Sequence, residues 1–192
     1  MSDIIKKPVW LDCDPGHDDA FAIILAAHHP ALELIGISTI VGNQTLEKTT
    51  QNAFKVAHIA GLPNDIPIIR GCGQSLCRHV MICPEIHGST GLDGADVPEH
   101  PEYRTSNQDE NFLWRIYQKI KQVNRPVTLI ATGSLCNVAL RLIVFPQGIS
   151  SYCCSFFFFS CENRLQNVYP KLFSWAVASA LETFIQHPNS TL

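Results

Sequence analysis

The chain has 192 residues, of which 46% are hydrophobic and 16% are charged, and its formal net charge is −3. This length suits one well-buried domain, and the small negative charge gives no electrostatic basis for binding nucleic acid or an anionic membrane. Segment 1–7 has no apolar run, and later apolar stretches end well before the ~20 residues of a membrane span. The eight cysteines include no CxxC pair, so we expect reduced thiols in a cytoplasmic protein rather than a zinc ribbon or a disulfide framework.

Strand and helix patterns alternate along the chain. Continuous apolar runs predict buried strands, and apolar residues spaced for one helical face predict helices. In chain order the predicted elements are strand 8–14, helix 18–29, strand 32–41, helix 45–60, strand 66–69, helix 109–123, strand 127–131 and helix 135–143. Thr45 and Ser134 can cap the helices that follow them. The first helix is expected to bury one apolar face, made of Ala20, Ile23, Ile24 and Ala27.

This alternation predicts an α/β fold, a Rossmann-like, mostly parallel sheet with helices on both faces. In such sheets ligands bind beyond the carboxyl ends of the strands. Segments 12–19, 42–44 and 131–133 follow predicted strands and are therefore the candidate site. Segment 71–106 has no clear period, and a loop of that length is usually functional or disordered.

Four of the 17 acidic residues of the chain, Asp12, Asp14, Asp18 and Asp19, lie within one short loop. Like charges this close raise one another's pKa unless a positive charge compensates them. A hard cation with oxygen ligands, such as calcium or magnesium, does so. The alternative is that Asp18 caps a helix, Asp19 interacts with its dipole, and the other two are loop residues.

The segment DCDPGHDDAFAI at 12–23 resembles the signature of the inosine–uridine-preferring nucleoside hydrolases. Three further segments extend the resemblance over residues 9–145: VGNQTLEKTTQNA at 41–53, EIHGSTGLDG at 85–94 and LIATGSLCNVAL at 129–140. The resemblance implies hydrolysis of the N-glycosidic bond of ribonucleosides such as uridine or inosine, giving ribose and a free base. It also implies one bound Ca²⁺ and a small-molecule nucleoside partner. Members of this family are often homo-oligomers, and the sequence leaves the oligomeric state and the purine or pyrimidine preference open.

The resemblance also assigns roles to the loop residues. Asp14 corresponds to the carboxylate that binds calcium and acts as general base on water. Asp19 corresponds to a second calcium ligand, and Thr132 to a residue whose main-chain carbonyl binds the metal. Asp18 corresponds to a ligand of the ribose hydroxyls, and Asp12 to an acid that supports the loop. Because cleavage creates an oxocarbenium-like centre, a carboxylate-rich pocket suits this chemistry.

Two more residues correspond to substrate contacts in the family. Asn43 corresponds to an amide that contacts the sugar, although local sequence alone favours a turn residue after Gly42. His87 lies in a segment near the base, with a surface histidine as the alternative. His17 is expected to be structural or exposed, as are His28 and His29.

The resemblance ends near Pro146, so we expect a nucleoside hydrolase portion at 1–146 and a divergent tail at 147–192. The tail contains four consecutive phenylalanines at 156–159 and a segment, 171–186, that suits an amphipathic helix. Its acidic residues are Glu162 and Glu182 and its histidine is His187, so the late aspartate and histidine of the family have no counterpart. We therefore expect the chain as written to hydrolyse nucleosides poorly or not at all.

Two alternatives to catalysis by a nucleoside hydrolase remain open at this point. One is a catalytically inactive, truncated relative, either a remnant that keeps only a binding site or an aberrant gene product. The other is a haloacid dehalogenase-like phosphatase, which also begins with a strand-end Asp-x-Asp. That motif requires Thr or Val where this chain has Gly16, and it gives Asp18 and Asp19 no role.

Overall fold

The computed structural model describes residues 5–77, 79–98, 111–145 and 152–153. Five parallel strands form one sheet in the order β3-β2-β1-β4-β5. The strands are β1 (Lys7–Cys13), β2 (Leu32–Thr39), β3 (Ile68–Arg70), β4 (Val127–Ala131) and β5 (Tyr152–Cys153). The helices are α1 (His17–His28), α2 (Leu46–Ile59), α3 (Pro84–His87), α4 (Phe112–Lys121) and α5 (Cys136–Val144). The predicted α/β fold is confirmed.

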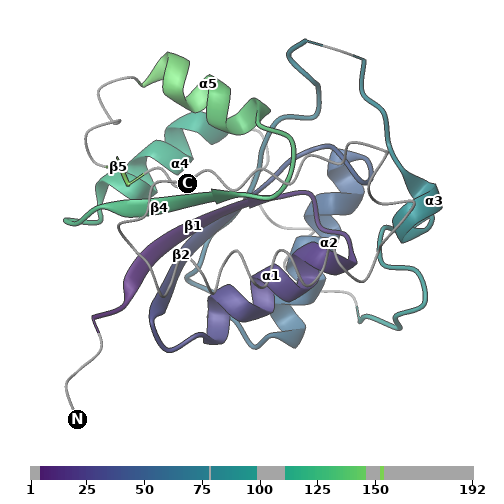
Figure 1. Ribbon diagram of the computed structural model, residues 1–192, viewed down its shortest axis with the longest axis horizontal. Helices are drawn as coiled ribbons and strands as arrows, with labels where there is room; N and C mark the ends of the chain where they lie inside the picture. The colour runs from purple at the N-terminus through teal and green to yellow at the C-terminus, as the bar shows by residue number, and fades with distance from the viewer. Residues whose placement is uncertain (1–4, 78, 99–110, 146–151, 154–192) are drawn as a thin grey trace.

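The helices cover both faces of the sheet (Figure 1). Helices α1 and α2 lie on one face, and α4 and α5 lie on the other. The short α3 lies beyond the end of the sheet toward which β1 and β4 point. This arrangement leaves the carboxyl ends of the central strands facing the loops that connect them to the helices.

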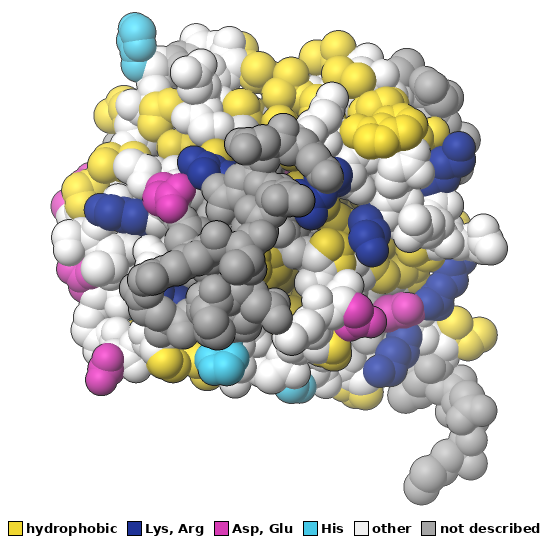
Figure 2. Space-filling model, turned by 180° about the vertical axis from the view of Figure 1, so that it is seen from behind, with side chains coloured by type: hydrophobic (Ala, Val, Ile, Leu, Met, Phe, Trp, Pro, Cys, Tyr) yellow, Lys and Arg dark blue, Asp and Glu magenta, His cyan; other side chains and the backbone are white. Residues whose placement is uncertain are grey.

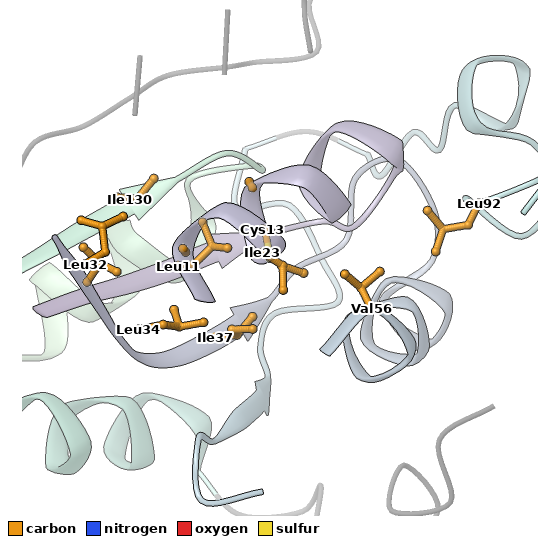
Figure 3. Packing of buried hydrophobic residues seen from close by; sticks show 12 residues of the cluster. Leu11, Cys13, Ile23, Leu32, Leu34, Ile37, Val56, Leu92 and Ile130 are labelled. Atoms are coloured by element: carbon orange, nitrogen blue, oxygen red, sulfur yellow. The ribbon is translucent and has the colours of Figure 1, made fainter. Parts of the chain in front are cut away.

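The alternation of side chains along β1 divides the core into two layers, because successive strand residues point to opposite faces. Leu11 and Cys13 pack toward α1 and α2, together with Ile23 (Figure 3), and Val9 belongs to the same buried cluster. Trp10 faces the other way and packs in a cluster with residues of β4, α4 and α5. Because both faces of β1 are buried, this strand fixes the position of the loop that follows it.

Helix α1 differs from its predicted orientation. Its buried residues are Asp18, Asp19, Ala22, Ile23 and Ala26, whereas Ile24 is 37% exposed. The predicted face is therefore wrong by about one residue. The rotation brings two carboxylates and the apolar stripe to the same side of the helix, toward the sheet.

The helix caps were predicted correctly at α2 but not at α5. The Thr45 side chain accepts a hydrogen bond from the Lys48 main-chain N at 3.5 Å. The residue preceding α5 is Leu135, and the Ser134 hydroxyl donates instead to the Val41 carbonyl at 3.3 Å. Ser134 thus ties the start of α5 to the end of the β2 segment.

Several features predicted from the sequence lie outside the described residues. These are the phenylalanine run at 156–159, the helix at 171–186 and the first residues of the predicted helix at 109–123. The boundary between 1–146 and 147–192 stays a prediction, and Tyr152 and Cys153 pair with Val127 and Thr128 of β4.

Among the residues that the structure describes, no helix is long and apolar enough to cross a membrane. On the face seen in Figure 2, basic and acidic side chains are intermingled with hydrophobic ones.

The orientation of α1 can be tested by comparing two isoleucines that are adjacent in the sequence. Ile23 is fully buried, so Ile23→Ala should lower the free energy of unfolding by ~2–5 kcal/mol, because the substitution leaves a cavity in the core. Ile24→Ala should cost clearly less, since part of that side chain already contacts solvent. Urea denaturation measures both values, and equal costs would contradict the orientation of the helix.

Candidate active site

The candidate site lies where β2, β1 and β4 end side by side. Asp14 follows the last residue of β1, Thr132 follows the last residue of β4, and Asn43 lies in the segment after β2. The first turn of α1 adds Asp18 and Asp19. All five of these residues are buried. The fold therefore brings the polar segments at the predicted strand ends to one edge of the sheet.

Asp14 is held by main-chain groups. Its Oδ2 accepts a hydrogen bond from the Asn43 main-chain N at 2.7 Å, and the Asn43 side-chain amide donates to the Asp14 carbonyl at 3.0 Å. A side chain at Gly42 would collide with Asp14 Oδ2, and a Cβ at Gly133 would lie 2.8 Å from Oδ1. The two glycines therefore allow the carboxylate to lie directly against the backbone of both neighbouring loops.

Asp19 lies next to Asp14. Its Oδ2 accepts a hydrogen bond from the Asp14 main-chain N at 3.2 Å, and the Thr132 side chain lies close enough to lower the pKa of Asp19. Thr132 is itself positioned by its main-chain N, which donates to the Asp12 carbonyl at 2.8 Å. The second oxygen of Asp19, Oδ1, is buried and has no hydrogen-bond partner among the described residues.

Without a positive charge nearby, the charged forms of Asp14 and Asp19 are electrostatically unfavourable. Burial, together with the neighbouring Asp18, raises the pKa of Asp14 to about 7. Burial also raises the pKa of Asp19 well above its ordinary value, with Asp18 and Asp14 as additional causes. A positive charge placed between these carboxylates would lower both pKa values, so the site suits a cation.

The donor set fits a hard cation only in part. Asp14, Asp19 and Thr132 offer oxygen ligands, and the buried Asp19 Oδ1 is an atom that a cation would satisfy. Within residues 5–98 (residue 78 excepted), 111–145 and 152–153, however, no three His, Cys, Asp or Glu side chains are grouped to hold a metal ion. Two carboxylates are thus the charged ligands that this portion provides.

The Asp18 carboxylate lies beside His87. Its Oδ1 lies 3.6 Å from His87 Nε2, beyond direct hydrogen-bond distance, and neither atom has a hydrogen-bond partner in the described part of the chain. His87 is 7% exposed, so the alternative of a surface histidine does not hold. Burial lowers the pKa of His87, while Asp18 opposes that shift. Two unsatisfied polar atoms therefore face a common point.

Asp12 supports the loop from the opposite side of β1. Its Oδ1 accepts hydrogen bonds from the Ser38 hydroxyl and from Asn137 Nδ2, the latter at 2.8 Å. Ser38 also accepts from Trp10 Nε1 at 2.9 Å. Burial raises the pKa of Asp12 to about 6, although the hydrogen bonds from Ser38 and Asn137 oppose the shift. Asp12 is thus part of the packing between the sheet and α5.

Sequence reasoning missed Asn137. This buried residue donates to Asp12 and to the Thr39 carbonyl at 3.1 Å, and its Oδ1 accepts from the Cys72 main-chain N at 2.8 Å. It therefore joins α5 to β1, to the end of β2 and to the segment after β3. The available signal was an amide within the apolar run 135–144, where a polar side chain needs buried partners.

The segment that carries His87 is docked against the N-terminal half of α2 and the residue Gln44 that precedes the helix. Gln44 Nε2 donates to the Gly88 carbonyl at 2.9 Å, and Asn52 Nδ2 donates to the Thr90 carbonyl at 3.0 Å and to the Pro15 carbonyl at 3.1 Å. Asp93 accepts from the main-chain N atoms of Ser89 and Thr90, and the bonds from Thr90 and Ser89 hold its pKa at about 2. These contacts fix the segment beside the acidic loop.

The model of the family "inosine-uridine preferring nucleoside hydrolase" matches residues 9–152. A pyrimidine-specific ribonucleoside hydrolase of Shewanella sp. strain MR-7 is 44% identical over 138 residues, which are 72% of this chain and 42% of that protein. A probable ribonucleoside hydrolase of Dictyostelium discoideum is 41% identical over 149 residues, 73% of this chain and 43% of that protein. The chain therefore spans less than half the length of these relatives.

Two solved structures show the same architecture. An inosine-guanosine nucleoside hydrolase superposes with a TM-score of 0.69 and 27% identity, covering 77% of this chain and 46% of that one. A purine-preferring ribonucleoside hydrolase from Gardnerella vaginalis gives a TM-score of 0.69 and 26% identity, covering 78% and 48%.

The raised pKa of Asp14 predicts how stability depends on pH in a metal-free buffer with a chelator. The folded protein holds the Asp14 proton up to about pH 7, whereas the unfolded chain releases it near 3.8. Between these pH values the folded state binds more protons than the unfolded chain. The contribution of Asp14 to the free energy of unfolding therefore decreases as pH rises. Asp14→Asn should remove that loss and give a shallower decrease between about pH 4 and 7.

The control for this measurement is Glu85→Gln, which changes an exposed carboxylate in α3. Its stability curve should run parallel to that of the unchanged protein. Urea denaturation at several pH values gives the three curves, and an Asp14→Asn curve parallel to the other two would show that Asp14 is not desolvated in the fold.

Proposed function

Because the chain belongs to the inosine-uridine preferring nucleoside hydrolase family, we propose that it acts in the hydrolysis of the N-glycosidic bond of ribonucleosides. The observation that carries the proposal is Asp14, a buried carboxylate at the end of β1 whose Oδ2 accepts a hydrogen bond from the Asn43 main-chain N. A carboxylate held in one orientation beside the site can act as a general base. The family assignment leaves no support for the phosphatase alternative.

In the proposed reaction Asp14 accepts a proton from the attacking water. The hydrogen bonds from Asn43 hold the Asp14 carboxylate in one orientation, which keeps the base directed at the site. Asp18 accepts hydrogen bonds from the ribose hydroxyls through its buried Oδ1, which has no partner among the described groups. The oxygen of the Asn43 side chain contacts the sugar. These contacts place the anomeric carbon of the ribose near the Asp14 carboxylate.

The carboxylates also favour the transition state. Cleavage of the N-glycosidic bond leaves positive charge on the sugar, which buried negative groups stabilise strongly in a water-poor pocket. Asp14, Asp19 and the Thr132 carbonyl would hold Ca²⁺, which offsets their charge and makes nearby water more acidic. Asp12 keeps the loop in place through Ser38 and Asn137.

His87 is proposed to contact the nucleobase of the substrate. Its Nε2 lies 3.6 Å from Asp18, the proposed ribose ligand, so a nucleoside held there would present its glycosidic bond to both residues. The relatives include both pyrimidine-specific and purine-preferring enzymes. The proposal therefore covers ribonucleosides as a class and names no preferred base.

A second candidate function is binding of a nucleoside without turnover. It is favoured by the finding that the described residues contain no group of three side chains placed for a metal ion. Both functions use Asp18 and Asn43, but only hydrolysis requires Asp14 as a base. The two functions therefore respond differently to substitution of that residue.

The test of the function is ribose release from uridine, cytidine and inosine by the 192-residue chain with calcium present. In a longer relative with the same acidic loop, the substitution that corresponds to Asp14→Asn should lower the turnover number by ~10²–10⁴-fold, since it removes the general base. Glu85→Gln, an exposed substitution, serves as the control. Saturable nucleoside binding without ribose release would favour the binding function, and neither binding nor release would contradict both.

Calcium binding has its own prediction, measured without substrate. Adding Ca²⁺ should raise the melting temperature, because a ligand that binds only the folded state stabilises it. Asp19→Asn should reduce this increase by removing one charged ligand, while Asp93→Asn should preserve it, because Asp93 lies exposed in the docked segment. An unchanged melting temperature in excess Ca²⁺ would rule out the metal site in this chain.

A further inference from the structure

A second histidine, His17, contacts His87 on the side away from Asp18. The Nδ1 atoms of the two rings lie 3.1 Å apart, and the ring centroids are 5.3 Å apart. The main-chain N of His17 also donates to His87 Nδ1 at 3.4 Å. The other nitrogen of the His17 ring, Nε2, lies 3.1 Å from the Asp93 carbonyl. His17 therefore contacts both the ring of His87 and the segment that carries it.

These contacts restrict where the protons of the two rings can be. A main-chain N–H only donates, so His87 Nδ1 must act as the acceptor for His17 N, which leaves the proton of a neutral His87 ring on Nε2. The other neutral form of His87, with its proton on Nδ1, would direct that N–H toward the main-chain N–H of His17. It would also turn the Nε2 lone pair toward the Asp18 carboxylate, 3.6 Å away. Both changes are unfavourable for buried groups.

The ring of His17 strengthens this preference. Satisfying every contact of the pair requires three protons, on His87 Nε2, between the two Nδ1 atoms and on His17 Nε2, while two neutral rings carry two. The contact that can be given up most cheaply is the exposed one between His17 Nε2 and the Asp93 carbonyl, since water can replace it there. His17 Nδ1 then donates to His87 Nδ1, and His87 Nε2 keeps its proton.

We propose that His17 is a positioning residue that holds His87 with its Nε2–H directed into the site beside Asp18. The inference rests on the proposed hydrolysis of ribonucleosides. In that reaction negative charge develops on the departing base, and a fixed N–H donor stabilises such charge better in the transition state than in the bound substrate. His87 makes the contact with the base, and His17 acts only through His87.

Gly16 shows that this packing is close. A Cβ at that position would lie 2.8–2.9 Å from atoms of the His87 ring. The turn before α1 therefore seats the ring against the backbone on one side, while His17 contacts it on another. The acidic loop thus carries both Asp18, a proposed sugar ligand, and His17, the residue that orients the contact with the nucleobase.

The direct test is ¹⁵N NMR of the full chain labelled at histidine, with the His87 signals assigned by their loss in His87→Gln. In the unchanged protein, we expect the proton on His87 Nε2 and a bare Nδ1. His17→Leu keeps bulk but removes the ring donor, so the two nitrogen shifts should move toward a mixture of both forms. His17→Gln keeps an N–H donor and should restore most of the original pattern.

The control is His28→Gln. His28 lies at the other end of α1 from His17, and its ring contacts the Ala60 carbonyl at 2.7 Å. This variant should leave the His87 signals unchanged. A proton on His87 Nδ1 in the unchanged protein would overturn the proposal. An unaltered His87 pattern in a folded His17→Leu variant would overturn it too.

A kinetic comparison separates positioning from a general loss of structure. With uridine, His17→Leu should lower kcat more than KM is changed, and by a larger factor than with a synthetic p-nitrophenyl riboside, whose leaving group needs no hydrogen bond. Equal losses on both substrates would show a merely structural role. If no nucleoside is hydrolysed by the unchanged chain, the proposed function fails, whereas the NMR result still decides the role of His17.

Discussion

The structure depends on the burial of three carboxylates, Asp12, Asp14 and Asp19, in one strand-to-helix segment. Burial disfavours their charged forms and raises the pKa of each. The partners that hold them are main-chain N–H groups and neutral side chains, contributed by the acidic loop itself, by β2 and the segment after it, and by α5. A backbone close enough to donate these bonds leaves no room for side chains at Gly42 and Gly133. The acids therefore determine how closely the three neighbouring loops approach.

Apolar packing directs the acids to their positions. Both faces of β1 are buried, by α1 and α2 on one side and by α4 and α5 on the other, so the strand has little freedom to shift. The buried side of α1 contains Asp19 together with three apolar residues, Ala22, Ile23 and Ala26. The hydrophobic stripe thus orients the helix, and the helix orients the carboxylates. The free energy that opposes their burial is offset by the packing of the same helix.

The alternation of elements and the clustering of polar segments at strand ends were readable from the sequence, because both follow from local patterns. The contacts that complete the site were not. Asn137 reaches Asp12 across 125 residues, and His87 reaches His17 across 70. Local pattern also misplaced the buried face of α1, since Ile23 and Ile24 are equally apolar and only the tertiary packing of the helix, which buries Ala22 and Ala26 with Ile23, distinguishes them. Likewise, Ser134 suits a cap, but the Val41 carbonyl is its actual partner.

The region around the start of α2 joins the two ends of the proposed nucleoside site. Asn43, just before the helix, fixes Asp14, while Gln44, Lys48 and Asn52 donate to the carbonyls of Gly88, Ser89 and Thr90. The residue proposed for the base, His87, precedes those carbonyls directly. Segment 43–52 therefore contacts both the carboxylates at the sugar and the segment that carries His87. A substitution of Lys48 would loosen the docked segment without removing the contacts of Asn43 with Asp14, so the contributions of the two ends can be separated by substituting one or the other residue.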